Sequence, residues 1–218
     1  MKKNILIACE ESQTVCKAFR ERGFNAFSCD IQQCSGGHTE WHFLGDCLEV
    51  IKNKSGKLQN GQEHFINGDW NLIIAHPPCT YLGIAGANHL YRHGVLNEQR
   101  YLKGLEAKLF FMQLYNLDVP HLAIENPKQF KIFNMPPYTQ EIQPYYFGDS
   151  YSKLTRLWLK NLPPLLPTAI CEKYETTKVA SNWFNAGNGI SRQKRRSKTF
   201  QGIANAMAEQ WGNFIMQK

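Results

Sequence analysis

One cysteine of the chain stands where it could act as a nucleophile. Cys79 follows two prolines in the stretch HPPCTYLGIAG (76–86), directly after the apolar run NLIIA. Prolines restrict the backbone and hold the thiol in place, and a thiolate in a polarising environment can add to an electron-poor ring carbon. The alternative is a buried structural cysteine, because free cysteine mostly behaves as a small hydrophobic residue.

A carboxyl group elsewhere in the chain could assist such a cysteine. Glu125, in the stretch AIENP, could protonate or hydrogen-bond a ring nitrogen while the ring accepts electrons. Together the two residues would activate carbon 5 of a pyrimidine, because addition of the thiolate at carbon 6 makes carbon 5 nucleophilic. The alternative is a glutamate that is salt-bridged or caps a helix.

Both residues fall at the ends of predicted strands. Apolar runs predict strands over 4–10, 24–31, 69–76, 121–127 and the segment around 151–160, and apolar periodicity predicts helices over 12–23, 94–117 and 199–217, with Ser12 as an N-cap and Gly23 as a helix stop. The segment CLEVI also favours a helix, whereas 34–46 and the polar stretch 52–68 read as loops. Alternation of strands and helices indicates a parallel α/β sheet. Parallel strands end at one edge, so Asp30, 76–79 and 125–127 should converge there.

Composition limits the class of protein. The chain has 218 residues, of which 43% are hydrophobic, so it should form one sizeable core. No apolar run reaches the roughly 20 residues of a membrane span. The start MKKNILIACEES has too short an apolar part for a signal peptide, and seven scattered cysteines favour reduced thiols. We therefore expect a cytoplasmic protein without a membrane partner.

A basic segment gives the chain a net charge of +7 and a pI of about 9.0. This charge favours a polyanionic partner such as nucleic acid. The segment RQKRRSK contains the basic residues that could contact phosphate groups. The alternative is a solvated basic loop. The candidates are Arg192, Lys194, Arg195, Arg196 and Lys198.

Four motifs resemble one family of enzymes. HPPCTYLGIAG resembles the catalytic Pro-Cys loop of the cytosine-C5 DNA methyltransferases, and LAIENP is similar to their Glu-Asn motif. LTRLWL resembles a later strand that bears an arginine, and FQGIANAMAEQWG resembles their C-terminal helix. The motifs keep the family's order across nearly the whole chain. The short phage and prophage members, which lack a large target-recognition domain, are the most similar in appearance.

The resemblance implies a fold and a reaction. The expected fold is the α/β, Rossmann-like fold of class I S-adenosylmethionine-dependent methyltransferases, with a mostly parallel central sheet and helices on both faces. The expected organisation is one domain over 1–218, with a short basic loop or lid at 165–200 and a C-terminal helix at 199–217 packed back on the core. The expected reaction transfers a methyl group from S-adenosylmethionine to carbon 5 of cytosine in DNA through a covalent Cys79 adduct, in a bacterial host or encoded by a phage or prophage.

The resemblance also implies roles for individual residues. Cys79 would be the nucleophile, Glu125 would contact ring nitrogen N3, Asn126 would fix the loop and Arg156 would help to hold the base. Asp30 would bind the ribose hydroxyls of S-adenosylmethionine and Asp46 its adenine amino group, and Ser12 with the next helix would receive its carboxylate. The remaining cofactor contacts would come from Pro77, Pro78, Leu82 and Asn205.

Two departures from the family pattern leave alternatives open. The first loop, ACEESQTV, has no glycine, and only a short segment separates Arg156 from Thr199. The chain could therefore need a separate protein for target recognition, accept duplex or single-stranded DNA, or act on free pyrimidine nucleotides. It could also be a catalytically inactive protein that binds nucleic acid or nucleotides.

Three other chemistries are alternatives to this prediction. Amino-methyltransferases place an aromatic residue where Cys79 stands, and thymidylate synthase-like enzymes need a phosphate site that SRQKRRSK matches poorly. A zinc site could use Cys29, Cys34, His38 and His42, although their spacing differs from that of zinc fingers.

Overall fold

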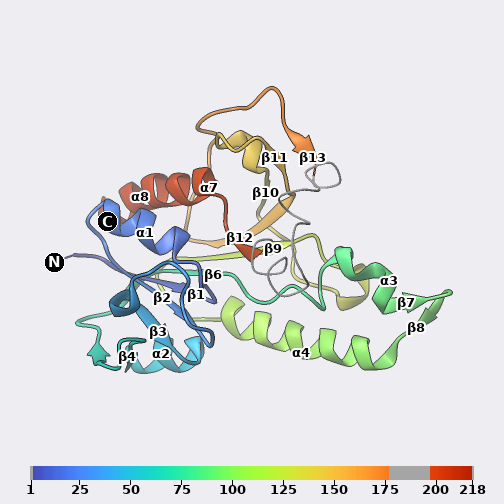
Figure 1. The fold of residues 1–218 in the computed structure, drawn as a ribbon, viewed down its shortest axis with the longest axis horizontal. Coiled ribbons are helices and arrows are strands. Elements are labelled where there is room, and N and C mark those ends of the chain that lie inside the picture. Colours follow the sequence, from blue (N-terminus) through green and yellow to red (C-terminus); the bar gives the residue numbers. More distant parts are fainter. Residues whose placement is uncertain (1, 177–196, 218) are drawn as a thin grey trace.

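A seven-stranded sheet forms the centre of the protein, whose computed structural model describes residues 2–176 and 197–217. The strand order is β10-β12-β9-β6-β1-β2-β3 (Figure 1). Strand β12 runs in the opposite direction to the other six strands of this sheet. The strands are β1 (Asn4–Ala8), β2 (Asn25–Asp30), β3 (His42–Leu44), β6 (Trp70–Ala75), β9 (Leu122–Pro127), β10 (Gln140–Ile142) and β12 (Thr155–Lys160).

Helices cover both faces of this sheet. One face packs against α1 (Thr14–Glu21) and the C-terminal elements α7 (Gln201–Ala206), η5 (Met207–Trp211) and α8 (Gly212–Met216). The other face packs against α2 (Cys47–Asn53) and α4 (Glu98–Tyr115). Strand side chains such as Ile5 and Ile73 are fully buried in these two layers, and each contributes about 1.5–3 kcal/mol. The predicted Rossmann-like α/β fold is therefore confirmed.

Short elements connect or flank these layers. The polar stretch 52–68 folds as a hairpin of β4 (Ser55–Lys57) and β5 (Glu63–Phe65), and β3 was not predicted because it is only three residues long. Beyond β6 the chain forms η2 (Ile84–Gly86), α3 (Ala87–Leu90), β7 (Tyr91–Arg92) and β8 (Val95–Leu96). The other short elements are η1 (Thr39–Trp41), η3 (Lys131–Phe133), η4 (Pro144–Tyr146), β11 (Tyr151–Ser152) and β13 (Glu175–Thr176).

The start of α1 differs from the sequence prediction. Gln13, not Ser12, is the N-cap residue, and its side chain makes no capping bond. The buried carboxylate of Glu10 accepts hydrogen bonds from the backbone N–H groups of Val15 (2.7 Å) and Cys16 (3.2 Å) instead. A carboxylate near a helix N-terminus is stabilised by the unsatisfied N–H groups and the helix dipole. The prediction of Gly23 as the stop is confirmed, since Gly23 follows the last turn with φ 83.

The C-terminal helix is interrupted rather than uniform. The described part begins at Gln201 and changes to a π-helical stretch at η5 before α8. Gly202 lies so close to Phe147 that an added Cβ would approach its carbonyl oxygen to 1.9 Å, and its N–H donates to Asp149 (2.9 Å). No helix among residues 2–176 and 197–217 is both long and apolar enough to cross a membrane. All seven cysteines are free in the structure.

Candidate functional site

The carboxyl ends of five parallel strands meet at one edge of the sheet. Residues after β6 and at the end of β9 form what we call the cysteine half of this edge. Residues after β1, β2 and β3 form the acidic half, with the four carboxyl groups of Glu10, Glu11, Asp30 and Asp46. The parallel pairings of β1 with β2 and β6, and of β6 with β9, bring the two halves together.

Cys79 is accessible, and the backbone around it is held firmly. It is the only exposed cysteine of the seven, all of which lie in the described part of the chain. Its carbonyl oxygen accepts hydrogen bonds from the N–H groups of Leu82 (3.1 Å) and Gly83 (2.8 Å). On the other side, the Asn126 amide donates to the carbonyl oxygen of Pro77 (2.9 Å). The neighbouring strand end thus fixes the loop that presents the thiol.

The segment that follows Cys79 has further anchors. The Arg100 guanidinium, from α4, donates to the Thr80 carbonyl oxygen (2.7 Å). The Ile84 N–H donates to Lys128 (3.0 Å), so the loop pairs with the segment after β9. Such preorganisation is what a nucleophile needs in order to meet its target at a fixed angle.

Glu125 has a histidine partner in the cysteine half. The Glu125 Oε2 atom lies 3.0 Å from Nδ1 of His76, and the two side chains are only 15% and 8% exposed. Burial works against ionisation of Glu125. The His76 hydrogen bond, the charges of Lys153 and His76, and a hydrogen bond from Thr155 outweigh burial, so the pKa of Glu125 lies below its usual value. The carboxyl is therefore ionised at neutral pH, and His76 Nδ1 must carry the proton between them.

His76 has no assigned role in the sequence prediction, although the sequence contains a signal for it. Ala75 of β6 is in register with Ile124 of β9, so the next residues, His76 and Glu125, are neighbours. The signal is a histidine at the end of one predicted strand, 69–76, and a glutamate near the end of another, 121–127.

The acidic half contains an unpartnered carboxylate. Glu11 is 7% exposed, and neither of its carboxylate oxygens has a hydrogen-bond partner among the described residues. Asp30 accepts from the Gln32 N–H (2.8 Å), but burial, aided by the charge of Glu11, raises its pKa above the usual value. Asp46 caps α2 by accepting from the Leu48 N–H (2.8 Å). A buried carboxylate without a partner costs free energy, so this half is suited to a cationic or hydrogen-bond-donating ligand.

The start of α1 is not available for an anion. Its Val15 and Cys16 N–H groups are already bound by Glu10, whose pKa is raised mainly by burial. The Ser12 hydroxyl lies 3.0 Å from that of Thr14 and accepts weakly from the Thr14 N–H (3.4 Å). The expected binding of a cofactor carboxylate by Ser12 and these amides would require Glu10 to be displaced.

The first loop bends without glycine. Cys9 (φ 59) and Gln13 (φ 58) both take up the left-handed conformation that glycine usually provides. The Gln13 amide, fully buried, donates to the carbonyl oxygen of His38 (2.8 Å), and its oxygen accepts from the His38 N–H (3.0 Å). Strain of this kind persists where surrounding contacts enforce it and is concentrated at functional sites.

Two predicted residues have other side-chain partners in the structure. Arg156 donates to Glu141 (2.9 Å) and stacks on Tyr138. It pairs in register with Asn126, whereas Glu125 pairs with Leu157, so Arg156 and Glu125 lie on opposite faces of the sheet. Leu82 is fully buried in a cluster with Leu90 and Phe133 and is closed to a ligand.

The remaining predicted residues are placed as follows. Pro78 is exposed and Pro77 is buried. Asn205 is half-buried and accepts from Gln201 (2.9 Å), and Lys198 is half-buried before Phe200. Four basic residues lie outside the described residues, namely Arg192, Lys194, Arg195 and Arg196.

Among the described residues, the four side chains of the zinc alternative form no metal-binding group. No group of three or more metal-binding side chains occurs in the described ranges, which include every cysteine and histidine. His42 lies 2.9 Å from both the Ser28 hydroxyl and the Gln32 carbonyl oxygen, and His38 stacks on Trp41. These side chains are engaged in packing and hydrogen bonding.

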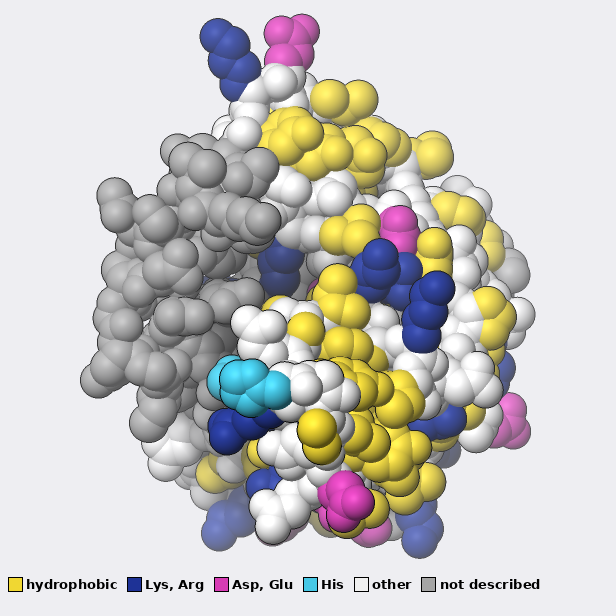
Figure 2. Space-filling view, turned by 90° about the vertical axis from the view of Figure 1, so that its right-hand side faces the viewer, with side chains coloured by type: hydrophobic (Ala, Val, Ile, Leu, Met, Phe, Trp, Pro, Cys, Tyr) yellow, Lys and Arg dark blue, Asp and Glu magenta, His cyan; other side chains and the backbone are white. Residues whose placement is uncertain are grey.

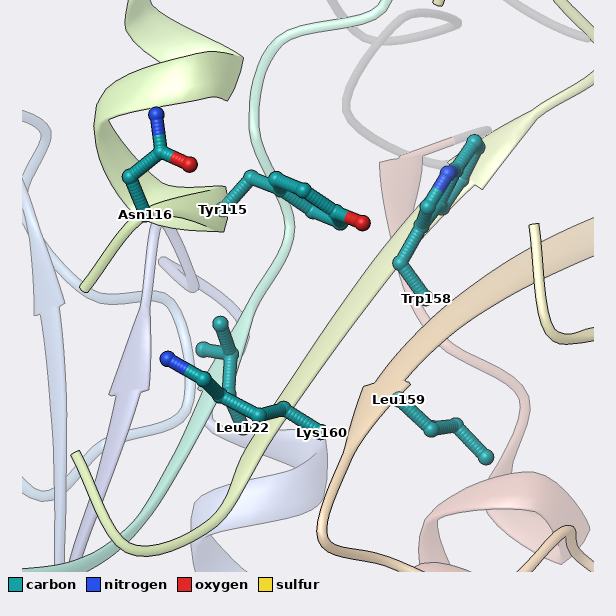
Figure 3. A pocket seen from close by; sticks show the side chains of 6 residues that line it. All are labelled: Tyr115, Asn116, Leu122, Trp158, Leu159 and Lys160. Carbon is teal, nitrogen blue, oxygen red and sulfur yellow. The ribbon is translucent and has the colours of Figure 1, made fainter. Parts of the chain in front are cut away.

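A separate pocket of about 310 Å³ lies at the opposite edge of the sheet. Figure 3 shows Tyr115, at the end of α4, and Trp158, of β12, lining it. It includes Leu122, the first residue of β9, whereas Glu125 lies near the last. It is therefore distinct from the edge that carries Cys79.

No protein-family model matches the chain, and no curated protein matches it. Among solved structures, it is similar to a protein titled a DNA modification methyltransferase encoded within an E. coli prophage (14% identity, TM-score 0.46, 83% of this chain and 54% of that one). It is also similar to a mutant of Spodoptera frugiperda DNMT2 (18%, 0.38, 80% and 55%) and to the Entamoeba histolytica methyltransferase EhMeth (17%, 0.39, 88% and 62%).

The chain thus spans between 54% and 62% of the length of these structures. Identities below 25% and TM-scores below 0.5 carry no argument about activity. The α/β architecture follows from the strand order and pairing of the chain itself.

Proposed function

We propose that the protein is a methyltransferase that transfers a methyl group from S-adenosylmethionine to carbon 5 of cytosine in DNA. The observation that carries this proposal is the cysteine half: an exposed thiol on a loop that is hydrogen-bonded to the next strand end, where the half-buried, ionised carboxylate of Glu125 lies. We propose one catalytic domain over 1–218, including the segment 165–200.

The proposed work of the chain's own residues is addition and release. The Cys79 thiolate adds to carbon 6 of the ring, which makes carbon 5 nucleophilic. Glu125 contacts ring nitrogen N3, where negative charge develops, and is the group through which a proton reaches that nitrogen. Asn126 holds the loop through the Pro77 carbonyl oxygen, so the thiol meets the ring at a fixed position.

The acidic half fits the proposed cofactor in charge. S-adenosylmethionine, when bound, supplies the methyl group as a sulfonium and also carries an ammonium group. Glu11 offers two buried carboxylate oxygens that have no partner in the described part of the chain, and Asp30 lies at the end of β2 for hydroxyl groups. The fit to the cofactor's carboxylate is poor, because Glu10 occupies the α1 amides.

DNA is the proposed substrate on the grounds of charge and surface. The chain has a net charge of +7, and Figure 2 shows Lys and Arg side chains beside hydrophobic ones on the face that carries β7 and β8. Exposed Tyr91 and Ile84 belong to the segment after Cys79. Basic side chains next to apolar and aromatic ones suit a nucleic-acid strand, and a duplex cytosine would have to be flipped out to reach Cys79.

The test is a transfer assay with separate substrate pools. The protein is incubated with methyl-labelled S-adenosylmethionine and, separately, duplex DNA, single-stranded DNA, RNA or free cytidine nucleotides. We expect label in 5-methylcytosine of DNA. Label only in RNA or nucleotides would contradict the proposed substrate, and no label in any pool, while the cofactor binds, would contradict the proposed activity.

A further inference from the structure

The ionised state of Glu125 raises a chemical problem at the proposed site. An ionised carboxylate accepts hydrogen bonds and cannot donate a proton. Electrons that move into the ring when Cys79 adds to carbon 6 collect on N3, which then needs a proton. The proton must therefore come from a group next to Glu125.

We propose that His76 stores this proton and passes it through Glu125 to N3 of the base. His76 Nδ1 lies 3.0 Å from Glu125 Oε2, within reach for direct transfer. His76 acts through Glu125 and does not touch the base, so it is a positioning residue rather than a catalytic one. The inference rests on the proposed function and deepens it.

His76 has charged neighbours besides Glu125. Its Nε2 atom is buried and has no hydrogen-bond partner among residues 2–176 and 197–217, so the contact with Glu125 is the hydrogen bond that its side chain makes there. The charged groups that face the pair are Glu10, after β1, and Lys153, before β12. Glu10 attracts an imidazolium, while Lys153 and Thr155 stabilise the Glu125 carboxylate. With these neighbours, the proton stays on His76 and the negative charge stays on Glu125 until the ring accepts electrons.

The step balances as follows. The Sγ–C6 bond forms from the thiolate electron pair, the C5=C6 pair moves toward C4, and the C4=N3 pair moves to N3. The step starts from an imidazolium, with protons on both ring nitrogens of His76. Glu125 takes the Nδ1 proton and passes a proton to N3, which leaves an imidazole that keeps its Nε2 proton and an ionised carboxylate. After carbon 5 has received the methyl group, its own proton is lost to solvent water and the C5–H electron pair re-forms C5=C6. The Sγ–C6 bond then breaks with its electron pair on sulfur, which regenerates the thiolate, and the N3 proton returns by the same route.

The first test compares His76→Gln with wild type in steady-state methylation of DNA. The Gln amide can still donate to Glu125 but cannot release a proton. We expect kcat to fall by about 10²-fold with little change in KM, and the pH optimum of kcat to move to lower pH, where Glu125 is protonated directly. His121→Gln is the matched control, because His121 is also buried and bonded through Nδ1 (2.8 Å to Asn71) but lies at the opposite edge.

A His76→Gln enzyme with the wild-type pH profile would overturn the proposal, because a purely structural role lowers kcat equally at every pH. A loss of kcat no larger than that of His121→Gln would overturn it as well.

A second measurement does not depend on activity. In ¹⁵N-histidine-labelled free protein, NMR should show that Nδ1 of His76 bears the proton and that its resonance moves in Glu125→Gln. Wild-type protein in which His76 carries its proton on Nε2 alone, or in which it never carries protons on both ring nitrogens over the pH range of activity, would overturn the proposal. This readout separates failure of the proton store from failure of the proposed methylation, which the transfer assay reports for wild type.

Discussion

The two halves of the site edge treat their carboxyl groups in opposite ways. In the cysteine half, Glu125 is surrounded by His76, Lys153 and Thr155, and its pKa is lowered. In the acidic half, burial raises the pKa values of Glu10 and Asp30, and Glu11 has no partner in the described chain. Among the described residues, Glu125 has charged and hydrogen-bonding partners in one half, whereas Glu11 in the other half has none.

The two halves of the sheet edge are therefore suited to two different tasks. A half whose carboxylate has partners can be rigid and ready before any ligand arrives, as the bonds around Cys79 and Asn126 indicate. A half with an unpartnered carboxylate gains stability when a positively charged ligand binds, because the ligand removes the cost of buried carboxylates. Substitutions in each half can test whether the two tasks are separate.

Replacement of Cys79 should have the largest effect. Cys79→Ala should abolish methyl transfer, by at least about 10³-fold, while leaving cofactor binding unchanged, because the thiol belongs only to the cysteine half. Initial rates and calorimetric titration with S-adenosylmethionine measure the two properties. Cys171→Ser is the control cysteine, and substantial transfer by Cys79→Ala would remove the nucleophile from the mechanism.

Glu125→Gln should be the next largest. We expect a fall in kcat of about 10²–10³-fold, since the amide cannot deliver a proton to N3. Rapid-quench single-turnover rates isolate the chemical step, with Glu106→Gln, on the exposed side of α4, as control. A single-turnover rate equal to that of the control would exclude Glu125 from the reaction.

Glu11→Gln should separate the halves most clearly. The apo protein should become more stable, because a buried unpartnered carboxylate is lost, while affinity for S-adenosylmethionine falls by about tenfold. Thermal unfolding with and without cofactor measures both effects, and Glu21→Gln, exposed at the end of α1, is the control. A lower apo stability together with unchanged affinity would contradict the assigned role of the acidic half.

The dependence of stability on pH should give the smallest effect, with opposite signs in the two halves. The lowered pKa of Glu125 means that its contribution to stability is present at neutral pH and is lost as pH falls through that pKa. The raised pKa of Asp30 means that its contribution is present at low pH and is lost as pH rises through that pKa. Urea unfolding of Asp30→Asn and Glu125→Gln between about pH 2 and 7 should therefore change the slope of the unfolding free energy against pH in opposite directions. Slopes that change in the same direction would refute the comparison.

The fold was predictable from the sequence because its signals are local. Apolar runs such as NLIIA mark strands buried on both faces, and their alternation with helices defines a parallel sheet. The three-residue strands β3 and β10 escaped prediction, since so short a segment carries no periodicity. The α1 cap was also missed, because Glu10 reaches the helix from outside the usual capping position.

The site was predictable only in part. Strand ends indicate where Asp30, Cys79 and Glu125 lie, but not which face of the sheet Arg156 takes or that Leu82 is buried. The free carboxylate of Glu11 and the contact between His76 and Glu125 depend on three-dimensional neighbours, which a single sequence does not contain.

Covalent trapping tests the central claim most directly. DNA in which cytosine is replaced by 5-fluorocytosine is incubated with the protein and S-adenosylmethionine, and the products are separated under denaturing conditions and mapped by mass spectrometry. Fluorine cannot leave carbon 5 as a proton does, so the account predicts a stable adduct joining Cys79 to the base, formed only when cofactor is present. Absence of an adduct with DNA and cofactor that are both shown to bind, or an adduct at another cysteine, would contradict it.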